Sequence, residues 1–370
     1  MRIAKVTLDG YYNYGNILQN YALQKVLINY AEVVDTLWWS ESNYLPIVWW
    51  KWNWKNLVKY ILNYNSYRTK FKSSIIGCEM ARQTKNKDFV DRYINYKFIG
   101  NRIYDLEKKY DYFLTGSDQV WNPWYAGNDV LFLKFAPKEK RISYAASIAS
   151  DEIPNNRIDE FKNKLNEMKC ISVREQSGAD IIYKLTGRKV VVNVDPTLLL
   201  PASEWRTMSR KPSWYKGGKY ILTYFLGKRP NEIINKISTE YNLPVVNLMD
   251  ESKSEHYITG VDEFLWAIEH AELVYTDSFH GTVFSIIFRT PFVVCNRVDG
   301  AVEGKMSSRI DTLLGGFGLE ERRGTVGNGY LIENPLTTPD WSKVEDVLAH
   351  ERTRTDDYLR QAFGLEGMER

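Results

Sequence analysis

Residues 273–295, LVYTDSFHGTVFSIIFRTPFVVC, contain the pattern that decides the fold. Two short apolar runs, Leu273–Thr276 and Phe292–Cys295, flank a longer apolar segment at Gly281–Phe288. Short runs rich in Val, Phe and Tyr predict buried strands, whereas the longer segment between them predicts a helix. A strand, a helix and a second strand in this order predict an α/β fold with a parallel sheet covered on both faces.

The same alternation of short apolar runs and helical patterns extends over most of the chain. It begins with an expected strand at Ile3–Leu8 and an expected helix at Ile17–Asn29. It restarts at Tyr220, after a segment rich in Pro, Gly and basic residues that we expect to be a linker. The sequence therefore predicts two Rossmann-like domains that face each other across a cleft. Their expected bounds are 1–202 for the N-terminal domain, 203–219 for the linker, 220–335 for the C-terminal domain and 336–370 for a terminal helical segment.

Length, charge and cysteine content exclude several classes of protein. A chain of 370 residues is long enough for two or three domains with their own cores. A formal net charge of +3 is too small to indicate a nucleic-acid partner. The three Cys residues are far apart, so neither a disulfide framework nor a zinc site is expected, and no motif demands any metal. Because no apolar leader or membrane-spanning run is visible, the expected location is the cytoplasm.

One part of the N-terminal domain, a predicted insert at about residues 38–100, has an unusual composition. Six of the 12 Trp residues lie within residues 38–54. Residues 42–78 contain six basic residues and no acidic one, and three of the lysines recur every four positions. A basic amphipathic helix with Trp is typical of membrane-surface elements, so one interpretation is peripheral contact with the inner face of the membrane. The other is a helix packed on its own domain with its lysines in solvent.

Polar residues at the ends of the expected strands are the candidate site residues, because ligands of open α/β sheets bind at the carboxyl ends of strands. His280 follows one such strand and can act as a general acid. Asp277 or Ser278 can cap the helix that begins there, and the N–H groups at Gly281 and Thr282 can bind an anion. The alternative is an ordinary helix cap beside an incidental histidine.

Basic residues elsewhere can complete an anion site. Arg174 ends another expected strand and can form a forked contact with a carboxylate or phosphate, although a surface pair with Glu175 explains it equally well. Lys305 and Arg309 flank two serines at an expected helix start, where an anion can bind or ordinary capping can suffice. These basic residues join the helix start at residues 278–282 as candidates for binding an anionic donor.

Two further loops suit recognition of a sugar: one after the first strand and one after the run at residues 112–115. Their amide side chains can bind hydroxyl groups and a tryptophan can stack on a sugar ring, although turns with packed aromatic residues share this composition. Asp118, in the second loop, can act as a base or orient an acceptor hydroxyl. The candidate acceptor-binding residues in these loops are Gly15, Asn16, Gln119, Trp121 and Asn122.

Five segments at these strand ends resemble the polysaccharide pyruvyl transferase family. They are NYGNILQNYALQ (13–24), FLTGSDQVWN (113–122), SVREQSG (172–178), VDPTLLL (194–200) and TDSFHGTVFSIIFRTPFVV (276–294). The resemblance implies a glycosyltransferase-B-like pair of Rossmann-like domains. It also implies transfer of pyruvate from phosphoenolpyruvate, a substrate and not a cofactor, onto sugar hydroxyl groups of a surface polysaccharide or exopolysaccharide precursor, as a cyclic ketal. The acceptor partner is then a sugar or a lipid-linked oligosaccharide.

Carried over residue by residue, the resemblance implies that Arg174 binds the donor and that His280 lies near its enolpyruvyl group. Family members can have Arg-Leu-His where this chain has Ser-Phe-His at residues 278–280, so Lys305 or Arg309 is expected to replace the missing arginine. Two other functions fit the same fold, since architecture does not determine chemistry. One is a glycosyltransferase that uses a nucleotide sugar, and the other is a glycan-binding relative without catalysis.

Overall fold

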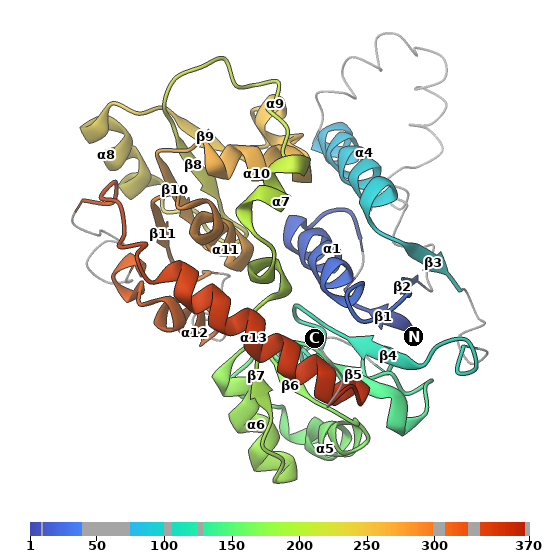
Figure 1. The fold of residues 1–370 in the computed structure, drawn as a ribbon. Coiled ribbons are helices and arrows are strands. Elements are labelled where there is room, and N and C mark those ends of the chain that lie inside the picture. Colours follow the sequence, from blue (N-terminus) through green and yellow to red (C-terminus); the bar gives the residue numbers. More distant parts are fainter. Residues whose placement is uncertain are drawn as a thin grey trace, which may run out of the picture.

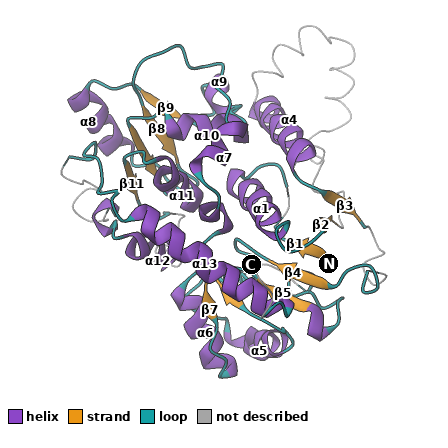
Figure 2. Ribbon diagram, viewed as in Figure 1, coloured by secondary structure: helices purple, strands orange, loops and turns teal. Residues whose placement is uncertain are grey.

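The computed structural model describes residues 1–8, 10–38, 75–99, 106–124, 129–298, 308–324 and 334–366 (Figure 1). Within these ranges two larger parallel sheets lie in separate halves of the molecule, with a two-stranded sheet beside the first and helices around and between them (Figure 2). The predicted α/β architecture of two Rossmann-like units is therefore confirmed.

The N-terminal half is built on a five-stranded parallel sheet with a shorter strand pair beside it. Its strands are β1 (Arg2–Val6), β2 (Val33–Trp38), β3 (Tyr96–Phe98), β4 (Tyr112–Thr115), β5 (Arg141–Ser143), β6 (Ser172–Val173) and β7 (Val191–Val192). The first five run in the order β3-β2-β1-β4-β5, and β6 pairs with β7. Bridges from Ile142 to Cys170 and from Ala146 to Val173 connect the β5 edge to the β6–β7 pair.

The C-terminal half has a four-stranded parallel sheet. Its strands are β8 (Ile221–Tyr224), β9 (Val245–Asn247), β10 (Leu273–Thr276) and β11 (Phe292–Val294). They run in the order β11-β10-β8-β9. All residues of β8 and β10 are buried, as expected of central parallel strands covered on both faces. The strand–helix–strand unit predicted at residues 273–295 is confirmed as β10, α11 (Phe279–Phe288) and β11.

Helices cover both sheets and occupy the space between them (Figure 1). Besides α11 they are α1 (Tyr14–Leu27), α4 (Ile75–Tyr93), α5 (Ile158–Asn166), α6 (Gln176–Thr186), α7 (Ala202–Met208), α8 (Asn231–Tyr241), α9 (Ser254–Tyr257), α10 (Val261–Glu269), α12 (Ser308–Phe317) and α13 (Val344–Phe363). Short 3-10 helices are η4 (Lys138–Lys140), η5 (Asn155–Arg157), η6 (Pro196–Leu199) and η7 (Glu320–Arg322). The last helix, α13, returns to the N-terminal half, where Leu359 and Phe363 share a core with Ile3 and Leu23.

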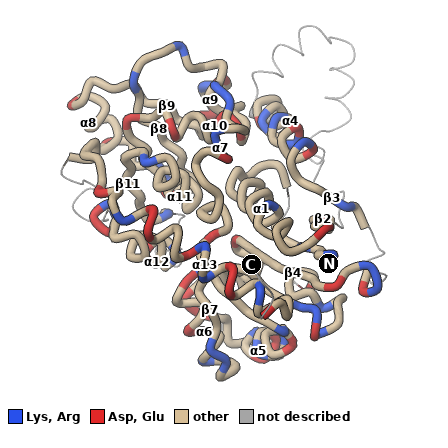
Figure 3. Tube along the Cα trace, viewed as in Figure 1, with Lys and Arg blue, Asp and Glu red and all other residues tan. Residues whose placement is uncertain are grey.

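The two halves share one large apolar core. Side chains of α1 lie in the same cluster as side chains of α10 and α11. All ten residues of α11 are buried and none is Asp, Glu, Lys or Arg, while α1 has Lys25 as its one charged residue (Figure 3). Tyr14, at the start of α1, stacks on Phe264 of α10 with the ring centroids 4.6 Å apart. This packing brings the amino end of α1 to the amino end of α11, at the junction of the two halves.

The predicted domain bounds stay a prediction, but the structure shows how two of the segments they name are built. Residues 75–99, predicted to belong to an insert, form α4 and β3, which are integral to the fold: β3 pairs with β2, and α4 packs on α9 and α10. The predicted linker begins within α7, whose Trp205 is fully buried against Tyr21 and Phe284. In both places apolar side chains spaced among polar ones are buried, which the composition of the segment does not reveal.

The tryptophan-rich part of the predicted insert begins at the end of β2. Trp38 packs edge-on against the rings of Tyr96 and Phe98 in β3, so the first tryptophan of the group belongs to the sheet. Residues 39–74, on which the predicted membrane contact depends, lie outside the described residues. In the part of the chain that the structure describes, no helix has an apolar run long enough to cross a membrane.

Candidate active site

Three loops at the carboxyl ends of the N-terminal strands converge on the guanidinium group of Arg174. Arg174 follows β6, and its side chain is 1% exposed. Its Nη1 donates to Oδ2 of Asp195, after β7, at 2.7 Å, and its Nη2 donates to Oδ1 of Asp118, after β4, at 3.2 Å. Burial alone would lower the pKa of Arg174, but Asp118, Asp195 and Glu175 hold it above its ordinary value. Arg174 is thus a buried cation between carboxylates, which excludes the alternative of a surface pair.

Asp195 lies at the centre of this cluster, although it was not among the candidates from the sequence. Its Oδ1 accepts hydrogen bonds from the N–H and the hydroxyl of Thr197, at 3.1 and 2.7 Å. Its Oδ2 accepts from the hydroxyl of Ser117 at 3.1 Å as well as from Arg174. Burial raises the pKa of this carboxyl group, but the charges of His280 and Arg174 together with these hydrogen bonds hold it well below its ordinary value. Asp195 therefore remains ionised at neutral pH.

Helix α1 holds the loop after β4 in place. Oε1 of Gln19 accepts from the N–H of Ser117 at 3.0 Å, and Nε2 of Gln19 donates to the hydroxyl of Thr7 at 2.8 Å. Asp118, the next residue of the loop, has a left-handed backbone with φ of 68°, a conformation that Asp adopts more readily than most residues. The segments at residues 13–24 and 113–122 are therefore parts of one site, in which the first supports the second.

His280 reaches the same cluster from the C-terminal half. It lies in the first turn of α11, its side chain is 8% exposed, and its Nε2 lies 3.5 Å from Oδ2 of Asp195. Its ring also lies against α1, because a Cβ atom added at Gly15 would be 2.0 Å from Nδ1. Atoms cannot approach that closely, so position 15 requires glycine. The structure thus brings together four residues predicted from strand ends: Gly15, Asp118, Arg174 and His280.

A second buried arginine lies near this cluster. The Cζ atoms of Arg174 and of Arg309, in α12, are 4.2 and 5.8 Å from the centroid of the Phe279 ring. Burial, followed by the positive charge of Arg174, lowers the pKa of Arg309 to about 10, so its guanidinium group remains charged at neutral pH. Two buried cations beside the same ring favour an anionic ligand, which would offset their repulsion. Lys305, the other candidate in this region, lies outside the described residues.

The start of α11 is capped differently from the predicted anion site. Ser278 is the N-cap: its hydroxyl accepts from the N–H of Gly281 at 3.2 Å, and its carbonyl accepts from the N–H of Thr282 at 3.1 Å. Asp277, the other predicted cap, instead accepts from the N–H groups of residues 226–227 at 2.8 and 2.7 Å. Because the N–H groups of Gly281 and Thr282 are already bound, the predicted anion site at these two positions does not fit the structure.

The cap at Ser278 has a measurable effect on stability. We expect Ser278→Ala to lower the free energy of unfolding by about 1 kcal/mol, because an N-cap hydroxyl satisfies an otherwise unpaired N–H of the first turn. Urea unfolding followed by circular dichroism measures this change. The exposed Ser213 provides the control, and Ser213→Ala should change the free energy by less than about 0.5 kcal/mol. Equal stability of the two variants would contradict the capping role.

The loop after β4 does not present its tryptophan to a ligand. Trp121 is fully buried, stacks on Phe132 with the ring centroids 5.0 Å apart, and donates from Nε1 to the carbonyl of Leu131 at 3.2 Å. The structure therefore contradicts the prediction that Trp121 stacks on a sugar, because the ring fills the core of the N-terminal half. In the same loop Nδ2 of Asn122 donates to Oε1 of Gln119 at 3.2 Å, which stabilises the turn. Acceptor binding by these two amides stays a prediction.

Several buried polar atoms in the segments that form the cluster have no hydrogen-bond partner within the described ranges. They include Oδ1 of Asn16, Nε of Arg174, Oε2 of Glu175, both polar side-chain atoms of Asn193 and Nε2 of His280, whose 3.5 Å contact with Asp195 is longer than a formed hydrogen bond. An unpaired buried polar atom costs about 1–3 kcal/mol, so several in one place indicate groups that bind a ligand. Asn16 was predicted as a ligand-binding residue, whereas Glu175 and Asn193 were not. In the sequence, Glu175 and Asn193 can be recognised as candidates only because each is a polar residue at the end of an apolar run.

The cluster is almost closed to solvent. The side chains of Arg174, Asp195 and His280 are 1%, 0% and 8% exposed. Burial of this kind keeps water away from the charged groups and strengthens the interactions among them.

A family model for polysaccharide pyruvyl transferases matches residues 13–299, well over half of the chain. The chain belongs to this family. The match to the pyruvyl transferases ends before Arg309 but includes the other residues of the cluster: Gly15, Asp118, Arg174, Asp195 and His280. No curated protein sequence is significantly similar to the chain.

Solved structures share the fold of this chain at low sequence identity. A putative UDP-N-acetylglucosamine 2-epimerase from Listeria monocytogenes has a TM-score of 0.53 and 10% identity, and the match covers 100% of this chain and 98% of that one. Another UDP-N-acetylglucosamine 2-epimerase has a TM-score of 0.56 and 12% identity, with coverage of 100% and 98%. HepE from Anabaena, in complex with UDP and glucose, has a TM-score of 0.51 and 10% identity, with coverage of 97% and 99%. These are glycosyltransferase-B-type folds, so the predicted fold class is confirmed.

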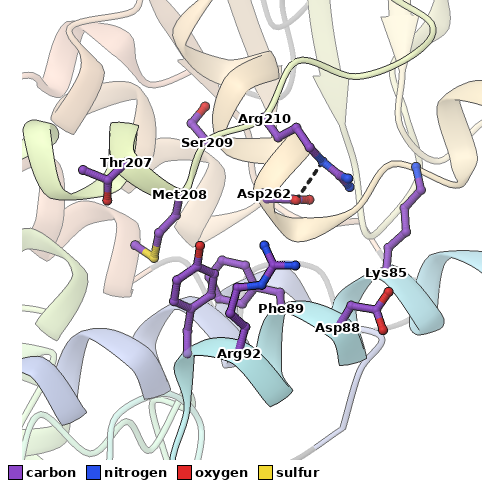
Figure 4. A pocket seen from close by; sticks show the side chains of 10 residues that line it. Lys85, Asp88, Phe89, Arg92, Thr207, Met208, Ser209, Arg210 and Asp262 are labelled. Atoms are coloured by element: carbon purple, nitrogen blue, oxygen red, sulfur yellow. Dashed lines mark ion pairs between the residues drawn. The ribbon is translucent and has the colours of Figure 1, made fainter.

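A cavity of about 280 Å³ lies away from the cluster, between α4, α10 and the segment after α7 (Figure 4). Two of its cations are already paired: Arg210 with Asp262 at 3.0 Å and Lys85 with Glu263 at 2.7 Å. None of the residues that line it belongs to the Arg174 cluster. Across the described ranges, no group of three or more His, Cys, Asp and Glu side chains could hold a metal ion. The Arg174 cluster is the candidate active site of this chain.

Proposed function

We propose that the protein transfers pyruvate from phosphoenolpyruvate to a pair of hydroxyl groups of a sugar. The observation that supports this proposal is the buried cluster in which Arg174, two carboxylates and His280 meet at the junction of the two halves. Membership of the pyruvyl transferase family supports the reaction class. Phosphoenolpyruvate as donor, and a sugar or lipid-linked oligosaccharide of an exopolysaccharide precursor as acceptor, are parts of the proposal. Residues 39–74, on which contact with a membrane depends, lie outside the described residues.

The cations of the site suit a donor with two anionic groups. Phosphoenolpyruvate carries a carboxylate and a phosphate, and Arg174 retains an Nε without a partner in the described chain to bind one of them. Arg309 remains charged, and Arg297, at 3.8 Å from Oδ2 of Asp277, adds a further positive charge near it. We infer that these two arginines replace the arginine that family members can have at position 278.

The reaction requires a proton donor and a proton acceptor. The first sugar hydroxyl forms a C–O bond to the central carbon of phosphoenolpyruvate, while the methylene carbon takes a proton from His280 and becomes a methyl group. Asp118 accepts the proton of that hydroxyl. The second hydroxyl then bonds to the same carbon, the bond from this carbon to the phosphate oxygen breaks, and phosphate leaves with the second proton. The products are a cyclic ketal and inorganic phosphate.

The proposal is tested by incubating the protein with phosphoenolpyruvate and either simple galactosides or lipid-linked sugars. Release of phosphate and the mass increment of a pyruvyl group on the acceptor are measured in the same samples. Both signals are expected, in equal amounts. Phosphate release without a change in acceptor mass would contradict transfer.

His280→Ala should lower turnover with phosphoenolpyruvate by at least about 100-fold, because positioned acid–base groups contribute roughly 10²–10⁴-fold. His350, in α13, is the matched control, since its side chain is 73% exposed and distant from the cluster in sequence. His350→Ala should retain wild-type turnover. A His280→Ala enzyme as active as the His350→Ala enzyme would exclude His280 as the acid.

The two alternative functions predict different ligands. A nucleotide-sugar glycosyltransferase would be stabilised against heat by UDP- or GDP-sugars and not by phosphoenolpyruvate, and the proposed pyruvyl transferase shows the reverse. A glycan-binding relative without catalysis would bind the acceptor after loss of both Arg174 and His280 and would release no phosphate. Thermal shift with each ligand, combined with the phosphate assay, separates the three.

A further inference from the structure

The two nitrogens of His280 have different surroundings. Nε2 faces the carboxylate of Asp195, with 3.5 Å between Nε2 and Oδ2. Turning the ring over about its Cβ–Cγ bond would place a carbon against that carboxylate, so the charge on Asp195 favours the observed orientation. Contacts of this length in a site without substrate commonly shorten when the substrate binds.

The Nδ1 edge of the ring remains available for a reactant. The Cβ that Gly15 lacks would lie 2.0 Å from Nδ1 and at an equal 2.6 Å from Cγ and Cε1. These distances place Gly15 over the face of the ring near Nδ1, and not in the ring plane along the direction in which Nδ1 exchanges a proton. Oδ1 of Asn16, the residue after Gly15, is buried without a partner in the described chain.

We infer that Asp195 is a positioning residue that holds Nε2 of His280 and leaves Nδ1 to exchange the proton with the substrate. The inference rests on the proposed function for the identity of the reaction, but its structural part stands on geometry alone. Asp195 suits this role because both of its oxygens are fixed, by Thr197 on one side and by Ser117 and Arg174 on the other. One carboxylate thus sets the positions of the donor-binding arginine and of the acid, which belong to different halves of the molecule.

Nitrogen NMR of protein labelled at histidine tests the structural part. We expect neutral His280 to carry its hydrogen on Nε2, with the signal assigned by its loss in His280→Ala. Asp195→Asn should reduce the fraction of neutral His280 that carries its hydrogen on Nε2, because an amide replaces the carboxylate that faces this nitrogen. Asp91→Asn, in an exposed pair with Lys87 on α4, is the control and should leave this fraction unchanged.

Activity tests the functional part through a double-mutant cycle. Asp195→Asn should lower kcat by about 100-fold in the wild-type background. In the His280→Ala background the same substitution should lower kcat by less than about threefold, because Asp195 acts through His280. A neutral His280 with its hydrogen on Nδ1, or equal losses in both backgrounds with a raised KM for phosphoenolpyruvate, would overturn the inference. The second result would show that Asp195 serves Arg174 alone.

Failure of the proposed function and failure of this inference give different experimental results. If no turnover with phosphoenolpyruvate is found while the NMR result is as expected, the proposed function fails and the positioning of His280 stands. If Asp195→Asn does not fold, Thr197→Val replaces it, since this variant removes one of the two hydrogen bonds that fix Oδ1 of Asp195 without changing the charge. Thr197→Val should then reduce the fraction of neutral His280 that carries its hydrogen on Nε2, and an unchanged fraction would contradict the inference.

Discussion

Gly15→Ala is expected to abolish detectable pyruvyl transfer and to lower the free energy of unfolding by about 1–3 kcal/mol, the usual cost of overpacking a buried site. The added methyl group would lie 2.0 Å from Nδ1 of His280. The ring cannot move away without leaving Asp195, because Nε2 lies 3.5 Å from that carboxylate. The alternative is that α1 moves, which would disturb Ser117 through Gln19. Either movement separates groups that must act on one substrate.

The matched control is a glycine of a helix with space around it. A Cβ at Gly316, in α12, would meet no atom within 4 Å. Gly316→Ala should therefore retain full activity and gain about 0.5–1 kcal/mol in stability, because alanine is the better helix former. Initial rates of phosphate release and urea unfolding of the two variants provide the comparison. An active Gly15→Ala enzyme would show that α1 does not contact His280 during catalysis.

Most of the fold could be predicted from the sequence because its strands are continuous apolar runs. β10 and β11 are central examples, since parallel strands covered on both faces contain few polar residues. Helix ends were harder to predict: α1 begins at Tyr14 and not at Ile17, because Asn13 caps it and its polar first turn is buried. The packing of α4 was also hard to predict, since this helix is polar on average yet packs on α10.

The candidate site was predicted in part, by the rule that ligands bind at the carboxyl ends of strands. That rule predicts Asp118, Arg174 and His280 as site residues from the sequence alone. It did not locate Asp195, which also follows a strand, because an Asp before Pro-Thr is explained equally well as a cap of a short helix, and it does cap η6. The rule also could not show that Trp121 faces the core, because spacing in a loop contains no information on which side a ring is buried.

Arg174→Ala is expected to produce the largest loss of stability, about 3–5 kcal/mol at pH 7, and to abolish binding of phosphoenolpyruvate. Removal of one partner of a buried ion pair leaves an uncompensated charge, and here two carboxylates, Asp118 and Asp195, lose the same cation. Arg174→Lys keeps the positive charge. The single ammonium group of lysine, however, cannot contact both carboxylates and a ligand at once, as the forked guanidinium group of arginine can. The lysine variant should therefore lose less stability than the alanine variant while binding the donor as poorly. Urea unfolding and calorimetric titration with phosphoenolpyruvate measure the two effects.

The pH dependence of the stability loss in Arg174→Ala shows whether Arg174 stabilises the protein through its charge or through its packing. In the wild type the pKa of Asp195 is below its ordinary value, so its contribution to stability is present above about pH 4 and is lost as the pH falls further. In Arg174→Ala the buried carboxylate of Asp195 lacks this cation, so its pKa rises and the variant is least stable, relative to the wild type, at neutral pH. As the pH falls from 7 to 4 this carboxylate takes up a proton, and the difference in free energy of unfolding should narrow. A difference that stays constant over this range would show that Arg174 stabilises the protein by filling space, and that Asp118 and Asp195 do not depend on its charge.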